Sequence, residues 1–344
     1  MVEKVFENIY RIVVGLPKNP LRELNSYIIC GGDRNLIIDT GFNTPECLAD
    51  LKEGISKLNL DMSKTDLLLT HFHADHVGLV HQVEDMAKAA GNDDFKIYMS
   101  QIDKSVSEKF ADKMYNWNVQ LQRFLGEGFP AKELDEVYAN HPAKRHTEPT
   151  DFDIVSLNDG DIFKVGDIEL QVIITPGHTP GHVCLYYEKE QIFFSGDTVL
   201  FNITPNISFW PASTKALGEY FLSLLKIREI PVKLCLPGHR AINTDLKGRI
   251  DELLKHHEER LQEVIDILKA NPTSTGYEVA KAMHWDIRAK DWSDFPSGQK
   301  WFAVAEAVAH IDFLVETNVV LKTQKEFEGR NVSAYMSLVE KIKL

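Results

Sequence analysis

The 344-residue chain has no uninterrupted apolar stretch long enough to cross a bilayer. Its start, residues 1–7, does not have the basic region followed by an apolar run that marks a secretory signal. Cysteine is scarce as well. The four cysteines include no closely spaced pair for metal binding, and we expect free thiols at Cys30, Cys47, Cys184 and Cys235. These absences predict a cytoplasmic protein with no membrane partner.

Basic side chains are fewer than acidic ones. The chain has 38 Lys and Arg against 51 Asp and Glu, which gives a formal net charge of −13. A field of this sign repels polyanions unless a local basic patch overrides it, so nucleic acid is not the favoured partner. A small-molecule substrate is expected instead. The hydrophobic content of 44% in a chain of this length is enough for two cores.

Histidine and aspartate are concentrated in one short segment. An apolar, strand-like run at residues 67–69 is followed by His71, His73, Asp75 and His76. A backbone that turns at the end of a strand can aim these side chains into one small volume. Nitrogen and oxygen ligands without sulfur suit zinc, iron or manganese in an open catalytic site. A polar loop whose histidines only face water is disfavoured, because further ligand candidates follow later in the chain.

Those further candidates each follow an apolar run. They are His178 in Thr-Pro-Gly-His, Asp197 in Ser-Gly-Asp-Thr, and His239 in Pro-Gly-His. Taken singly, a histidine after a strand is more often structural, and a Gly-Asp pair is more often a turn. Together with the first segment, they predict a metal centre.

With these motifs in place, the sequence resembles the metallo-β-lactamase superfamily over roughly residues 1–240, and all seven ligand positions are filled. The contexts of His178 and Asp197 are most similar to the glyoxalase II branch, and this chain offers no cysteine at a ligand position. The resemblance implies two divalent metal ions, with zinc as first choice and iron or manganese as alternatives. It assigns His71, His73 and His178 to the first metal, Asp75, His76 and His239 to the second, and Asp197 to a bridge between them.

The order of segments predicts an α/β fold. Strand-like and helical patterns alternate, and two β-rich halves each end in ligand loops, which fits two sheets with helices outside. The resemblance implies an αββα sandwich. We predict a catalytic domain over residues 1–244, with a helical insertion at about 101–150 that either forms a lid or packs on the sandwich.

The pattern changes from about residue 245 to three helices followed by two β-like runs. This order resembles the winged-helix domain that is appended to one group of metallo-β-lactamase-like proteins, and we predict such a domain over residues 245–344. A near-neutral charge, with Glu326 and Glu328 in the wing turn, favours packing or formation of a homodimer over nucleic-acid binding. We interpret His256, His257 and His284 as surface or core residues.

The predicted mechanism follows from the metal site. Two cations bridged by Asp197 would lower the pKa of a shared water, so that a bridging hydroxide forms at neutral pH. Asp75 is the predicted catalytic residue, because it can accept a hydrogen bond from the nucleophile and orient it. Asp39 and His182 are candidates to fix the ligand imidazoles.

The predicted function is therefore a dinuclear metal-dependent hydrolase of a thioester or another activated ester. The sequence suggests no convincing proton donor, which favours leaving groups that are already good. Lactones are the nearest variant. A phosphodiesterase or endoribonuclease, and an iron-dependent oxidoreductase, are the alternatives from other classes.

Overall fold

The structure is a computed structural model, and it describes residues 1–342 except 112, 140–148, 211–214 and 288. The chain divides into two compact units. Unit 1 contains residues 1–111, 146–205 and 223–250, and unit 2 contains residues 112–145, 206–222 and 251–344. The predicted insertion at about 101–150 contributes residues to both units, and its residues 140–148 lie outside the described part. The predicted domain boundary at residues 244/245 stays a prediction.

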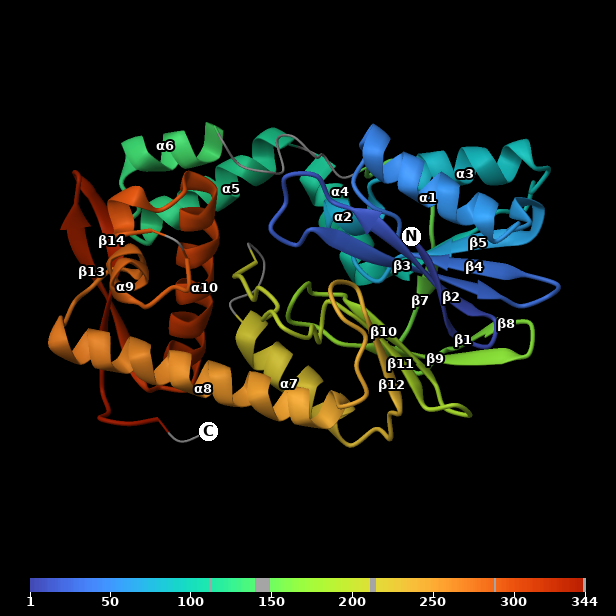
Figure 1. Cartoon of the computed structure of the whole chain (residues 1–344). Helices are drawn as coiled ribbons and strands as arrows, with labels where there is room; N and C mark the ends of the chain where they lie inside the picture. Colours follow the sequence, from blue (N-terminus) through green and yellow to red (C-terminus); the bar gives the residue numbers. More distant parts are fainter. Residues whose placement is uncertain (112, 140–148, 211–214, 288, 343–344) are drawn as a thin grey trace. The chain divides into compact units, whose positions relative to one another are not determined.

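The first sheet of unit 1 is mixed and seven-stranded, in the order β1-β2-β3-β4-β5-β6-β7 (Figure 1). Its strands are β1 Val2–Phe6, β2 Ile9–Gly15, β3 Glu23–Cys30, β4 Asn35–Ile38, β5 Thr65–Leu68, β6 Ile97–Ser100 and β7 Val155–Leu157. The first four pair antiparallel, and β4 to β7 pair parallel. The predicted turn at residues 31–33 joins β3 and β4 and is confirmed. Because β4 and β5 are parallel, the residues that follow these two strands lie at the same edge of the first sheet.

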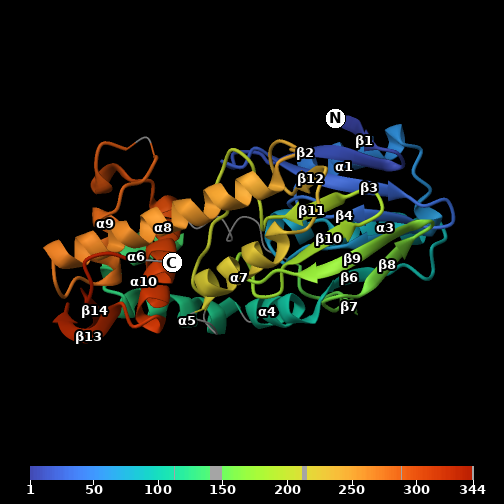
Figure 2. The ribbon, with the colours of Figure 1, turned by 90° about the horizontal axis from the view of Figure 1, so that it is seen from below.

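The second sheet of unit 1 has the order β12-β11-β10-β9-β8 (Figure 2). Its strands are β8 Ile162–Val165, β9 Ile168–Ile174, β10 Val183–Tyr187, β11 Ile192–Gly196 and β12 Leu234–Pro237. Strands β8 to β11 pair antiparallel, and β11 pairs parallel with β12. Strands β9, β11 and β12 therefore run in one direction, and the segments with His178, Asp197 and His239 leave the sheet at the same edge.

Both sheets contribute to one buried core, as a two-sheet sandwich requires. Ile38 and Leu68 of the first sheet share this core with Phe194 of the second. The rings of Tyr27 and Phe194 meet edge to face, with 5.5 Å between centroids. The hydroxyl of Tyr27 donates to the carbonyl oxygen of Pro237 at 2.8 Å, which links the two sheets close to the ligand loops.

Helices flank the first sheet (Figure 1). Helix α1, Pro45–Lys57, begins at Thr44, whose side chain accepts from the Cys47 amide, and Pro45 at the first position suits a helix start. Helix α3, Val80–Ala89, packs beside β5. The sequence has a helical pattern at about 77–90, and α3 fills it from Val80 onward. Residues Ala74–Val77 form a separate short helix, α2, and a short 3-10 helix, η1 Met62–Lys64, precedes β5. All four cysteines are unpaired, as predicted.

Unit 2 contains helices and a hairpin. Its elements are α5 Lys113–Gly126, α6 Ala131–Ala139, α9 Gly276–Ala282, η3 Trp292–Asp294, α10 Ser297–Glu316, β13 Val320–Phe327 and β14 Arg330–Ser337. Helices α7, Ala216–Arg228, and α8, Leu246–Ala270, have residues in both units, and α4, Gln101–Ala111, belongs to unit 1. The sequence pattern predicts a helical stretch over 105–125, and α4 and α5 occupy it on the two sides of residue 112, which lies outside the described part.

The C-terminal elements follow the predicted order of three helices and an antiparallel hairpin. The structure establishes the hairpin, whereas the identification as a winged helix stays a prediction. In the described part of the chain, no helix has the length and apolar character needed to cross a membrane.

Candidate metal centre

Three histidines converge at the edge of unit 1 where β5 and β9 end. The Nε2 atom of His71 lies 3.0 Å from Nδ1 of His73, and that Nδ1 lies 3.0 Å from Nε2 of His178. Four ligands at the usual zinc–nitrogen length stand roughly 3.3 Å apart in a tetrahedral site. The three nitrogens therefore have the spacing of ligands around one ion, and this trio could hold a metal.

A second group lies beside the first. Nε2 of His239 lies 3.4 Å from Oδ2 of Asp75 and 3.3 Å from Nε2 of His76. These three side chains also form a group that could hold a metal ion. Asp75 and His76 are on the short helix α2, whereas His239 follows β12, so the two sheets supply this group together.

Asp197 lies between the two groups. Its Oδ2 atom is 3.6 Å from Nε2 of His178, 3.7 Å from Nε2 of His76 and 3.3 Å from Nε2 of His239. Its Oδ1 atom is buried and has no hydrogen-bond partner among the described residues. A buried carboxylate oxygen without a donor is costly, and a cation would satisfy it. The structure thus brings all seven predicted residues together, and their donor set fits a binuclear metal site.

Asp39 supports this site from the end of β4. Its Oδ1 accepts from the amide of Thr70 at 2.8 Å, and its Oδ2 accepts from the Thr70 hydroxyl at 2.8 Å. The same Oδ2 lies 2.8 Å from Nδ1 of His76. In its neutral form, His76 therefore carries its proton on Nδ1 and presents an unprotonated Nε2 to the group. The contact predicted for Asp39 is confirmed.

Two more ligand imidazoles are oriented by their other ring nitrogen. The Thr70 hydroxyl donates to Asp39, so its oxygen accepts from Nδ1 of His71, which lies 3.0 Å away. Nδ1 of His239 donates to the carbonyl oxygen of Glu23 at 2.7 Å. In their neutral forms, both rings then direct an unprotonated Nε2 toward the site. Thr70 was not predicted from the sequence, and its place directly before the first histidine is the signal that could have found it.

His182 was predicted to fix a ligand imidazole, but its ring forms hydrogen bonds with the backbone of Asp197 and with two threonine hydroxyls, so it supports Asp197 instead. The backbone amide of Asp197 donates to Nε2 of His182 at 2.9 Å, so the His182 proton is on Nδ1, near the hydroxyl oxygens of Thr175 at 3.0 Å and Thr198 at 2.9 Å. Gly196 is required here, because it has a φ of +45° and a Cβ would stand 2.5 Å from Nε2 of His182. The ring fixes the backbone that carries Asp197.

Burial and charge act differently on the two groups. Burial lowers the pKa of His73 to about 3, and it holds the pKa of His71 well below its usual value. Burial opposes charge on His239 too, but Asp197 and Asp75 outweigh it and raise that pKa to about 10. His71 and His73 of the first group are therefore neutral imidazoles, while attraction between imidazoles and carboxylates holds the second group together.

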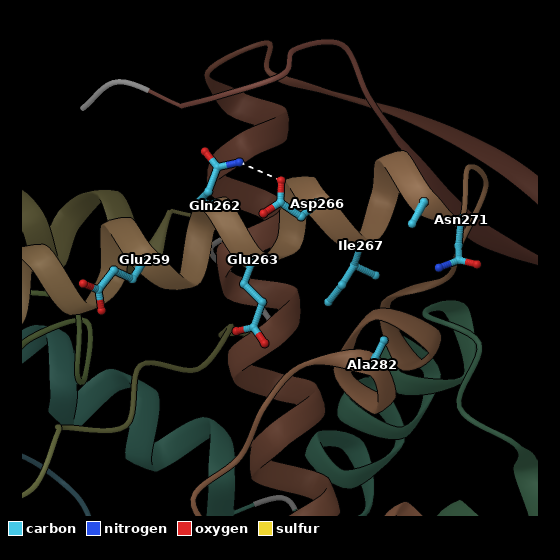
Figure 3. Close-up of a pocket in the computed structure, with 8 residues that line it drawn as sticks. Glu259, Gln262, Glu263, Asp266, Ile267, Asn271 and Ala282 are labelled. Atoms are coloured by element: carbon cyan, nitrogen blue, oxygen red, sulfur yellow. Dashed lines mark hydrogen bonds between the residues drawn. The ribbon is translucent and has the colours of Figure 1, made fainter.

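Unit 2 contains a cavity of about 530 Å³ that holds none of these seven residues (Figure 3). It is lined by Glu259, Gln262, Glu263, Asp266, Ile267, Ala270, Asn271 and Ala282. Gln262 donates to Asp266 at 2.9 Å, and Glu263 accepts from Arg260 at 2.5 Å. Among the described residues, none of the groups that could hold a metal ion includes a residue of this cavity.

Comparison with known proteins agrees with this geometry. The sequence model of the metallo-beta-lactamase superfamily matches residues 20–239, more than half of the chain. A probable metallo-hydrolase of Bacillus subtilis, YqjP, is 25% identical over 82% of this chain and 85% of its own length. The atrochrysone carboxyl ACP thioesterase nsrC of Aspergillus novofumigatus is 27% identical over 78% of this chain and 65% of its own.

A solved structure shows the same fold. A metallo-beta-lactamase family protein of Thermus thermophilus superposes with a TM-score of 0.76 and 24% identity, over 97% of this chain and 100% of the other. The chain belongs to the metallo-β-lactamase superfamily. With its His/Asp site, it is a metal-dependent hydrolase of that superfamily.

Proposed function

We propose that this hydrolase is dinuclear and cleaves a thioester or a similarly activated ester, with zinc as the first-choice metal. The observation that carries the proposal is the convergence of nitrogen and oxygen donors from seven residues, among them Asp197, whose Oδ1 is buried without a partner in the described structure. Only nitrogen and oxygen donors are present, and such a set suits a catalytic metal centre with room for water.

Each ligand has a place in this proposal. His71, His73 and His178 would hold the first metal, Asp75, His76 and His239 the second, and Asp197 would bridge them. Two divalent ions in such a site would lower the pKa of a bound water and would polarise the carbonyl oxygen of the ester. Asp75 accepts a hydrogen bond from the attacking water and orients it toward the carbonyl carbon. Asp39, the Thr70 hydroxyl and the Glu23 carbonyl hold three of the imidazoles in the tautomer that binds metal.

Two observations support a thioester as the substrate. One relative is named a thioesterase, and it is 27% identical to this chain. In addition, a thiol has a pKa of about 8.5, so the thiolate leaves near neutral pH without a proton from a side chain. A lactone is the nearest variant, because the attack on its carbonyl carbon is the same.

A nuclease is the alternative from a different class, and charges on the C-terminal hairpin argue against it. Lys325 pairs with Glu278 at 2.6 Å, and Arg330 pairs with Glu328 at 3.1 Å. Lys and Arg side chains that already pair with carboxylates contribute less free energy to phosphate binding, whether or not these elements form a winged helix. Nucleic acid therefore ranks below a small substrate.

The test begins with protein purified without added metal. Elemental analysis should find about two ions per chain, and thioesters should be hydrolysed faster than lactones or phosphodiesters. If the bound metal is iron and the protein consumes oxygen during turnover, the oxidoreductase alternative is favoured. Rapid cleavage of RNA or a phosphodiester, with no action on any thioester, would contradict the proposal and favour the nuclease.

A further inference from the structure

Asp103 is a buried carboxylate on α4 that contacts both loops of the first metal group. Its exposed fraction is 0%. Its Oδ1 accepts from the amide of Gly181 at 2.5 Å, and its Oδ2 accepts from the Thr179 hydroxyl at 2.7 Å and from the amide of Phe72 at 3.2 Å. Phe72 stands between His71 and His73 in the sequence, and Thr179 and Gly181 belong to the loop that follows His178.

The close approach of Gly181 is a second, independent sign of this junction. A Cβ at Gly181 would stand 2.3 Å from the hydroxyl oxygen of Ser100 and 2.6 Å from the amide nitrogen of Asp103. That amide in turn donates to the Ser100 hydroxyl at 3.1 Å. Only glycine lets the loop after His178 lie directly against the start of α4.

We propose that Asp103 is a positioning residue that fixes the loop carrying His71 and His73 relative to the loop carrying His178. The inference rests on the proposed assignment of these three histidines to one metal. The loops are far apart in the chain, because Asp103 is 31 residues from Phe72 and 78 from Gly181. No hydrogen bond within either loop can set the distance between them, whereas one rigid carboxylate on a helix can.

The chemistry at this position requires an ionised carboxylate. Two backbone N–H groups, one from each loop, point at different oxygens of Asp103. A backbone donor cannot reverse, so each oxygen must accept. In Asp103→Asn, either orientation of the amide places an NH₂ group against one of these donors, and one loop loses its link. The Thr179 hydroxyl can rotate and does not decide the orientation.

The experiment measures the affinity of the first metal directly. Co²⁺ is titrated into His239→Ala protein, in which the second group lacks a ligand, and the visible absorption band reports coordination. Asp103→Asn is then added to this background. Burial raises the pKa of Asp103 to about 7, so the titration is run near pH 8, where the carboxylate is ionised. We expect Co²⁺ to bind about 10- to 100-fold more weakly, with an altered spectrum.

Asp66→Asn is the matched control. Asp66 is also buried in unit 1 and accepts from a backbone amide, that of Lys96 at 2.9 Å, but its other partner is Arg34 rather than a ligand loop. The Asp66→Asn substitution should lower the melting temperature and leave Co²⁺ affinity unchanged. Thr179→Val, which removes one donor and keeps the carboxylate, should weaken Co²⁺ binding by a smaller factor.

The outcomes separate this inference from the proposed function. Unchanged Co²⁺ affinity in Asp103→Asn would overturn the inference and leave the metal assignment standing. If Asp103→Asn does not fold, unchanged affinity in Thr179→Val would overturn it instead. Failure of the wild-type chain to bind any metal would overturn the metal assignment, and the inference with it.

Discussion

The Nδ1 atom of His76 lies 2.8 Å from Oδ2 of Asp39, and both side chains are buried. Asp39 also binds the amide and hydroxyl of Thr70, and Thr70 in turn accepts from His71. One carboxylate thus orients a histidine in each of the two metal groups. Asp39 holds a φ of +61°, an uncommon conformation for a residue other than glycine, and the three hydrogen bonds of its side chain help to hold it there.

Replacing Asp39 by Asn tests this arrangement. Asn tolerates a positive φ, so the backbone should be kept. Its amide, however, offers one accepting oxygen where the amide of Thr70 and Nδ1 of His76 need two. We expect metal affinity to fall by about 10- to 100-fold, with a comparable loss of hydrolysis at limiting metal. Isothermal titration with Zn²⁺ measures the affinity.

Asp312→Asn is the control for this substitution. Asp312 is a buried carboxylate of unit 2 that accepts from Arg123 at 2.8 Å, so its loss should affect stability and leave metal binding unchanged. Equal Zn²⁺ affinity in Asp39→Asn and wild type would show that Asp39 does not orient His76 for a metal.

Substitution of the ligands should separate the two metals. His71→Ala should reduce first-site metal and the rate together, and His239→Ala should mainly empty the second site. Asp197→Ala should impair both, because its Oδ2 lies within 3.7 Å of His76 and His178. Metal content by elemental analysis measures the loss, and His256→Ala should change neither content nor rate. A full complement of metal with normal turnover in His71→Ala would contradict the assignment.

The sequence is enough to select the seven candidate ligands that the structure brings together, because each lies after an apolar strand in a recognisable context. Asp103 carries no such signal: it is an acidic residue in a helix, and its partners lie 31 and 78 residues away. Helix α7 is not predicted either. Its buried Leu217 and Leu224 are interspersed with exposed Leu222 and Leu225, so the apolar residues do not form the single stripe that marks an amphipathic helix.

A histidine pair in unit 2 should make stability depend on pH. Nδ1 of His257 lies 3.0 Å from Nε2 of His310, whose own Nδ1 donates to the Glu306 carbonyl at 2.8 Å. Burial lowers the pKa of His310 to about 3 and that of His257 well below its usual value. The folded protein therefore keeps both rings neutral at a pH where the unfolded chain binds protons.

This difference in protonation between the folded and unfolded states makes the protein less stable as the pH falls. Below a pH of about 6.5, His310 is protonated in the unfolded chain but stays neutral in the folded protein. The free energy of unfolding therefore falls by about 1.4 kcal/mol per pH unit for each such histidine. This stability is fully present above about pH 6.5 and is lost as the pH falls toward 3. His310→Gln should reduce the slope by that amount. Urea unfolding of metal-free protein between about pH 6 and 4 measures it, and identical slopes would refute the prediction.

Truncation at residue 245 tests the predicted domain boundary. Helix α5 would remain in the fragment, but its partners in α10 and β14 would be removed. The ring of Phe124 lies 4.0 Å from that of Trp301, and the buried Glu127 accepts from Tyr335 at 2.7 Å. The fragment would expose Phe124, so we expect it to aggregate, as size-exclusion chromatography would show.

Full-length Trp301→Ala is the matched control for the truncation. This substitution removes the same ring contact, at a cost of about 3–5 kcal/mol in the free energy of unfolding, while the rest of unit 2 remains. The variant protein should therefore stay soluble, with a lowered melting temperature and normal metal content. A monodisperse fragment of residues 1–244 that unfolds cooperatively and hydrolyses a small thioester would contradict this expectation. It would show that the catalytic domain folds without the C-terminal helices and that α5 finds other partners there.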